Sequence, residues 1–123
     1  MIIIKPEVNA IIDDYVNYLI NEGETSQMRA FNKKDLMIQA LNKNLGGILT
    51  HRPSTYKDLG RDEGCRLYVY VDPKSKTQWG FAHKVDEDNN VIIYYMKNMK
   101  LVKEQEEVKK SLDFMWRLLR VAR

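Results

Sequence analysis

Three alternating segments separated by short turns dominate the second half of the sequence and constrain its fold more than any other feature. The segments are Cys65–Val71, Gln78–Val85 and Val91–Lys100, and the turns between them are Asp72–Ser75 and Asp86–Asn90. Turns this short join neighbouring strands that run in opposite directions. The sequence therefore predicts a three-stranded antiparallel meander.

Alternation within these segments predicts which side chains share a face of the sheet, because successive side chains of a strand point to opposite faces. In the first segment the apolar face carries Leu67, Val69 and Val71, and the other face carries Arg66, Tyr68 and Tyr70. By the same rule, Tyr94 and Tyr95 point to opposite faces.

The remaining elements follow from apolar spacing and from helix-ending residues. Residues 1–4 are β-branched apart from Met1 and indicate a short strand. Apolar residues at helical spacing predict one helix from Pro6 to Gly23 and a second that begins at Thr25 or Ser26 and ends at Gly46-Gly47. Residues 101–123 predict a C-terminal helix.

The order of elements is therefore β-α-α-β-β-β-α. Helices separated from a run of strands are typical of the α+β class. With 123 residues, we expect one domain spanning 1–123, in which a small antiparallel sheet packs on the two N-terminal helices.

Composition narrows the function classes. The chain has one cysteine, Cys65, so no disulfide forms within it, and we interpret it as a small buried apolar residue of a protein from a reducing compartment. No apolar run is long enough for a leader or a membrane span, which predicts a cytoplasmic protein with no membrane contact. Residues 97–123 carry eight basic and four acidic residues, which fits either nucleic-acid binding or a solvated helix face.

This element order and several local stretches resemble the RelE/ParE superfamily of bacterial toxins. The stretches are Leu59-Gly60, the strand GCRLYVYV at 64–71, the aromatic strand WGFAH at 79–83 and the last strand VIIYYMK at 91–97. The resemblance covers roughly residues 1–100, judged by the order of elements.

The resemblance implies a toxin of a type II toxin–antitoxin pair. RelE-like members resemble ribosome-dependent endoribonucleases that cut mRNA in the ribosomal A site, and ParE-like members act on DNA gyrase without cutting nucleic acid. Members of both kinds are neutralised by a small antitoxin. The partners implied here are a cognate antitoxin and, for a nuclease, the ribosome and its mRNA, with no cofactor and no metal.

RNA cleavage without a metal requires a group that accepts the 2′-hydroxyl proton, a group that stabilises charge on the phosphate and a group that protonates the leaving oxygen. The resemblance to RelE-like enzymes, which use Lys, Arg, Tyr or His on the sheet, makes Arg66, His83, Tyr95 and Lys97 the candidate catalytic residues. The candidate RNA-binding residues are Arg61, Tyr68, Lys84 and Lys100.

Two departures from the family pattern keep other functions open. Gly80 follows Trp79 at a point where the family often carries Arg after an aromatic residue, and of Arg66 and Tyr68 only one is basic where some members have two lysines. The alternatives are a ParE-like inhibitor that only binds a protein target, and a non-toxic protein-binding domain of the same fold.

Each candidate also has a purely structural interpretation. His83 is a packed core residue if it shares a face with Trp79 and Phe81, and His51 is an exposed loop residue. The Arg66–Tyr68–Tyr70 strip either stacks RNA bases or is covered by the C-terminal helix. The apolar residues of that helix, including Met115 and Leu119, either pack on the sheet or contact an antitoxin or a second copy in a homodimer.

Overall fold

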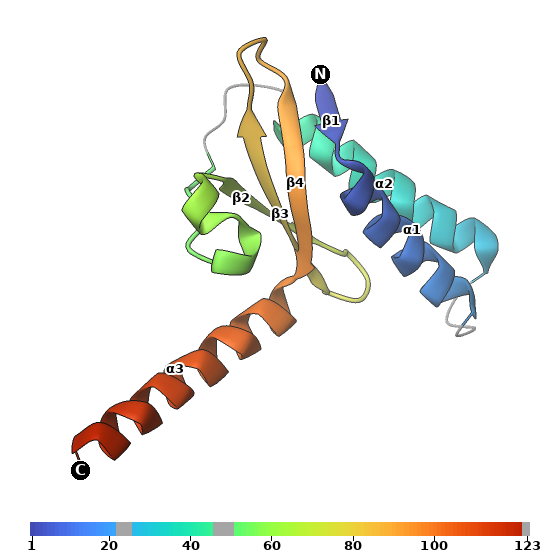
Figure 1. The fold of residues 1–123 in the computed structure, drawn as a ribbon. Coiled ribbons are helices and arrows are strands. Elements are labelled where there is room, and N and C mark those ends of the chain that lie inside the picture. The colour runs from blue at the N-terminus through green and yellow to red at the C-terminus, as the bar shows by residue number, and fades with distance from the viewer. Residues whose placement is uncertain (22–25, 46–50, 122–123) are drawn as a thin grey trace.

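A computed structural model describes residues 1–21, 26–45 and 51–121 (Figure 1). The elements are β1 (Ile2–Ile4), α1 (Pro6–Asn21), α2 (Gln27–Leu45), the 3₁₀ turns η1 (Lys57–Leu59) and η2 (Arg61–Glu63), β2 (Arg66–Val71), β3 (Gln78–Val85), β4 (Val91–Asn98) and α3 (Met99–Val121). The α+β class is confirmed. The predicted helix-ending residues Gly23 and Gly46-Gly47, and the alternative cap Thr25, lie outside the described residues.

The four strands form one sheet in the order β1-β4-β3-β2. The meander β2-β3-β4 is antiparallel, as predicted. The prediction of a wholly antiparallel sheet is wrong, because β1 runs parallel to β4, with Ile2 opposite Val91 and Ile4 opposite Ile93. No short turn joins these two strands, so the sequence holds no local signal for their partner or direction.

The main core lies between one face of the sheet and the two N-terminal helices (Figure 1). Its fully buried residues come from all of these elements: Val8, Ile12, Met37, Leu41, Leu45, Phe81, Ile93 and Met96. Tyr70 is buried in the same cluster and Tyr68 packs against it. The Arg66–Tyr68–Tyr70 strip is therefore on the helix-covered face, and the interpretation that the C-terminal helix covers it is wrong.

A register shift between β3 and β4 changes where the two adjacent tyrosines point. Ala82 pairs with Tyr95 and His83 pairs with Ile93, so Tyr94 is an extra residue on β4. The rings of Tyr94 and Tyr95 lie 6.5 Å apart, and both pack against the second core cluster. The prediction that they point to opposite faces is wrong, because a bulge interrupts the alternation on which it rests.

The second core cluster lies on the other face of the sheet, where the 3₁₀ turns cover part of it. Its buried residues are Leu59, Cys65, Ala82, Met99 and Val102. Helix α3 begins at Met99, two residues before the predicted position, because the Asn98 side chain accepts a hydrogen bond from the backbone N–H of Lys100 at 3.0 Å and caps the helix. After this first turn α3 extends away from the body (Figure 1).

Gly80 has a packing role at the base of α3. A side chain on this residue would collide with the sulfur of Met99 and would crowd Leu59. Glycine at this position therefore has a packing cause, because Met99 and Leu59 occupy the space that a side chain would need.

Gly60 and Gly64 form a matched pair for testing this corner of the fold. Both have positive φ, at 73° and 75°, which costs any other residue about 1–2 kcal/mol. A methyl group at Gly60 would also collide with the Cys65 side chain, whereas nothing lies within 4 Å of the same position at Gly64.

We therefore expect Gly60→Ala to lower the free energy of unfolding by about 2–4 kcal/mol and Gly64→Ala by only about 1 kcal/mol. Urea denaturation followed by circular dichroism measures both values. Equal losses in the two variants would show that the contact with Cys65 does not hold this corner.

Candidate functional site

Arg66 and His83 are neighbours on the helix-covered face of the sheet. They are paired residues of β2 and β3. The Arg66 guanidinium donates a hydrogen bond to the backbone oxygen of His51 at 2.6 Å, which ties the loop before η1 to the sheet. The His51 ring lies 5.5 Å from the His83 ring and 5.2 Å from the Tyr68 ring, so it closes the end of this cluster.

His83 has no exposed surface, as the core interpretation of this residue expects. Its Nδ1 lies 3.2 Å from the backbone oxygen of Phe81, to which it donates in the neutral tautomer, and its Nε2 is buried without a hydrogen-bond partner. Burial is the main cause of the lowered pKa of His83; the hydrogen bond to the Phe81 carbonyl raises the pKa by less, and the nearby His51 and Arg66 lower it a little further. A substrate has no direct path to this imidazole in the observed conformation.

Tyr95 and Lys97 lie on the opposite face. They pair with Ala82 and Gly80, which alternate with the inward-facing residues of β3. The Tyr95 hydroxyl donates to Glu63 Oε1 at 2.9 Å, and this hydrogen bond is the main cause of the raised pKa of Tyr95. Lys97 is exposed. The sheet therefore separates the four candidate catalytic residues into two pairs.

A groove of about 300 Å³ lies between the start of α1 and the part of β4 that continues beyond β1. Tyr94, Tyr95, Lys97 and Lys5 contribute to its lining, together with Glu7, Val8, Ile11 and Met96. The Lys5 ammonium lies 4.2 Å from the centre of the Tyr94 ring, and the Lys84 ammonium lies 5.6 Å from it. Cations and aromatic rings thus lie close together on this side of the sheet.

The other candidate RNA-binding residues lie in different parts of the structure. Arg61, on η2 beside Glu63, pairs with Asp62 at 3.1 Å, and Lys100 is exposed on the first turn of α3. Tyr68 is on the helix-covered face, where its hydroxyl accepts a hydrogen bond from the Asn44 side chain at 3.0 Å. We name the group Lys5, Glu63, Lys84, Tyr94, Tyr95 and Lys97 the open-face cluster.

Sequence reasoning did not identify three members of the open-face cluster, Lys5, Glu63 and Tyr94. Lys5 reaches Tyr94 only because β1 pairs with β4, and Glu63 reaches Tyr95 across a sequence separation of 32 residues. His51 was interpreted as an exposed loop residue, yet it is half-buried against His83 and Tyr68. Its place in a loop segment beside Arg52 and Pro53 gives no sign of this.

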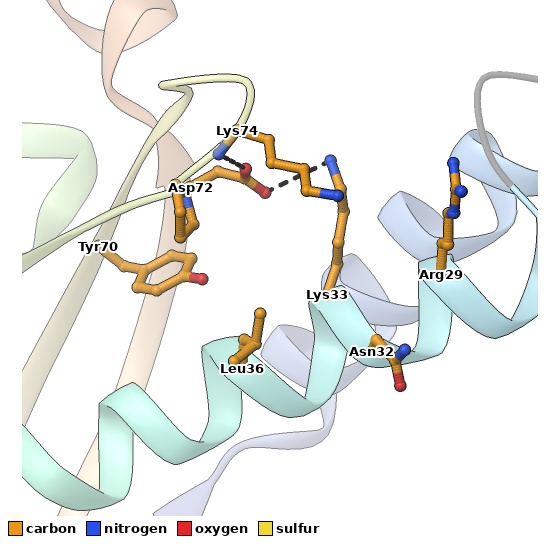
Figure 2. A pocket seen from close by; sticks show the side chains of 8 residues that line it. Arg29, Asn32, Lys33, Leu36, Tyr70, Asp72 and Lys74 are labelled. Carbon is orange, nitrogen blue, oxygen red and sulfur yellow. Dashed lines mark hydrogen bonds and ion pairs between the residues drawn. The ribbon is translucent and has the colours of Figure 1, made fainter.

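A second hollow, of about 390 Å³, lies between α2 and the turn after β2 (Figure 2). Arg29, Lys33 and Lys74 surround it, and Asp72 forms part of its wall. The buried Asp72 carboxylate accepts hydrogen bonds from the backbone N–H groups of Lys74 and Ser75 at 2.9 and 3.0 Å, and its Oδ2 lies 3.6 Å from the Lys33 ammonium. This arrangement closes the β2–β3 turn onto α2.

Within residues 1–21, 26–45 and 51–121, no group of three or more His, Cys, Asp and Glu side chains is placed to hold a metal ion. Among the same residues, no helix has both the length and the apolar composition needed to cross a membrane. Comparisons with protein families, with curated proteins and with solved structures found no match to this chain.

Asp72 gives the fold a defined dependence on pH. Burial alone raises the pKa of its carboxyl group, but the N–H donors of Ser75 and Lys74 and the Lys33 ammonium outweigh it, so the pKa lies below its ordinary value. A carboxyl group with a lowered pKa in the folded state stabilises the fold above its ordinary pKa, near 4, and this contribution is lost as the pH falls through the lower value.

We expect Asp72→Asn to lower the free energy of unfolding at pH 7 by about 1 kcal/mol, because the charge on the hydrogen-bond acceptor is lost. The difference between variant and wild type should shrink as the pH falls below about 4, the ordinary pKa of the carboxyl group. Urea unfolding of both proteins at several pH values measures it. A difference that stays constant between pH 7 and pH 3 would contradict the assigned ionisation.

Proposed function

We propose that this chain is a toxin of a type II toxin–antitoxin pair and that it binds and cleaves mRNA on the ribosome with its open-face cluster. The observation that carries the proposal is the groove along β4, where Tyr95 and Lys97 lie beside Lys5 and Tyr94. Ammonium groups contact phosphates, and exposed aromatic rings stack on unpaired bases. The resemblance to the RelE/ParE superfamily, which rests on the order of elements, supports the same function.

Three members of the cluster can supply the chemistry. In metal-independent cleavage the 2′-oxygen bonds to phosphorus as its proton leaves, the bond to the 5′-oxygen breaks, and that oxygen takes up a proton. In our proposal the Glu63 carboxylate accepts the 2′-hydroxyl proton and the Tyr95 hydroxyl protonates the leaving oxygen. Glu63 then returns its proton to Tyr95 along their hydrogen bond. The Lys97 ammonium stabilises the negative charge that builds on the phosphate.

The roles of the other candidate residues change in this proposal. Lys5 and Lys84, whose ammonium groups both lie near the Tyr94 ring, hold the RNA backbone beside it. Arg66 and His83 organise the loop at His51 and do not touch the substrate, because they lie on the other face of the sheet. The partners are translating ribosomes and a small cognate antitoxin, which places the activity in the cytoplasm.

A second candidate function is supported by the separation of the four candidate catalytic residues onto two faces of the sheet. If all four predicted catalytic residues are needed for cleavage, their separation by the sheet favours a ParE-like inhibitor, or a non-toxic domain, that only binds a protein. The open-face cluster would then contact an acidic surface on that protein.

Expression of the chain under tight control, with mapping of mRNA 5′ ends at the onset of growth arrest, separates these functions. For the nuclease we expect cuts that require translation. Lys97→Ala and Tyr95→Phe should each reduce cutting by about 10²-fold, because they remove charge stabilisation and proton donation. Lys43→Ala, which removes an exposed lysine of α2, is the matched control and should leave cutting unchanged.

Each alternative result has a definite meaning. Growth arrest without RNA cuts would contradict the nuclease and support the protein-binding inhibitor. Normal growth with folded protein would exclude both toxins and leave the binding domain. Cutting that survives both Lys97→Ala and Tyr95→Phe would remove the chemistry from the open-face cluster.

A further inference from the structure

Most of α3 has no contact with the rest of the described chain. Only Met99 and Val102, in its first turn, belong to a core cluster. Five other apolar residues of the helix are between 50 and 57% exposed: Leu101, Val108, Leu112, Met115 and Leu119. Leaving this many large apolar side chains in water is unfavourable, so this surface requires a partner.

The spacing of these residues specifies the partner's shape. Together with Gln105 they recur at intervals of four, three, four, three and four residues. This is the heptad pattern of a coiled coil, in which Leu101, Val108 and Met115 are d positions and Gln105, Leu112 and Leu119 are a positions. We name these six residues the α3 seam.

A groove on α3 matches what such a pairing needs. It measures about 400 Å³ and is lined by Leu101, Glu104, Gln105, Val108 and Lys109. In a parallel coiled coil, a side chain at an a position inserts between two successive d residues, a g residue and the a residue of the facing helix. Leu101, Val108, Glu104 and Gln105 hold these four positions here, so the groove fits the Gln105 side chain of an identical helix.

The polar residues of the seam select a parallel arrangement in register. In that arrangement the two Gln105 amides meet and hydrogen-bond to each other, and each Glu104, at a g position, lies opposite Lys109, at an e position, of the other copy. In an antiparallel pair with full overlap, Gln105 would be buried against Met115, and the two Lys109 ammonium groups would approach each other. Both changes are unfavourable.

We propose that two copies of this chain associate through the α3 seam as a parallel, in-register coiled coil. The body of each copy is attached on the e side of its helix, through the buried Val102. The two e sides face away from each other in a parallel pair, so the bodies lie on opposite sides of the seam. The proposal is independent of any activity of the open face.

Sedimentation equilibrium of the full chain from about 1 to about 200 µM tests the association, because a dimer dissociates on dilution by mass action. We expect the mass of two chains at the upper end of this range. Leu112→Glu, within the seam, should raise the dissociation constant at least about tenfold, which corresponds to about 1.4 kcal/mol. A monomeric mass at every concentration would overturn the proposal.

Phe114→Glu is the matched control. Phe114 is as exposed as the seam residues, at 62%, but it occupies a c position outside the seam. We expect its dissociation constant to stay within about threefold of the wild-type value. If Phe114→Glu and Leu112→Glu weaken the dimer equally, the association is non-specific and the seam is excluded. Circular dichroism of both variants checks that the helix content is unchanged.

Disulfide formation tests the orientation. Under mild oxidation, Gln105→Cys should give a cross-linked dimer, because equivalent a positions meet across a parallel seam within disulfide reach. Lys110→Cys, on the outer face of the helix, should give none. The native Cys65 is buried and does not interfere. A dimer that cross-links at neither position would contradict the parallel register.

Discussion

The packing of the sheet against α1 and α2 is the constraint on which the rest of the structure depends. Phe81, Ile93 and Met96 are fully buried against these helices, and each large apolar side chain removed from water stabilises the fold by about 1.5–3 kcal/mol. Because strands alternate, this burial also fixes what lies on the opposite face. The half-buried Tyr95 and the exposed Lys97 lie on the opposite face for the same reason that Met96 between them is buried.

The parts of this fold that depend on local sequence pattern could be predicted. Each strand of the meander follows from a period of two, and the short turns fix the antiparallel direction, so β2, β3 and β4 were predicted to within two residues. The parallel pairing of β1 with β4 could not be predicted, because it joins segments that lie far apart in the sequence with no short turn between them. The bulge at Tyr94 could not be predicted either, since one inserted residue leaves no mark on composition.

Individual residues of the candidate site could be predicted from the sequence, but their positions relative to one another could not. Alternation placed Arg66 and Tyr68 together correctly, yet it does not say which face the helices cover. That choice rests on the apolar stripes of α1 and α2 and on the direction in which the chain enters the sheet. The contacts that define the open-face cluster, Glu63 with Tyr95 and Lys5 with Tyr94, cross between elements and have no counterpart in sequence spacing.

The packing of Met99 against Gly80 fixes the base of α3, so the far end of the helix moves when this packing changes. The helix follows β4 without a linker, and its first turn is fixed in the second core cluster beside Gly80 and Leu59. With 23 residues it is about 34 Å long, so a tilt of about 5° at its base moves its tip by about 3 Å. Small repacking around Gly80, which pairs with Lys97 of β4, is therefore magnified at the far end of the helix, and a force on the far end acts back on the packing of Met99, Gly80 and Leu59.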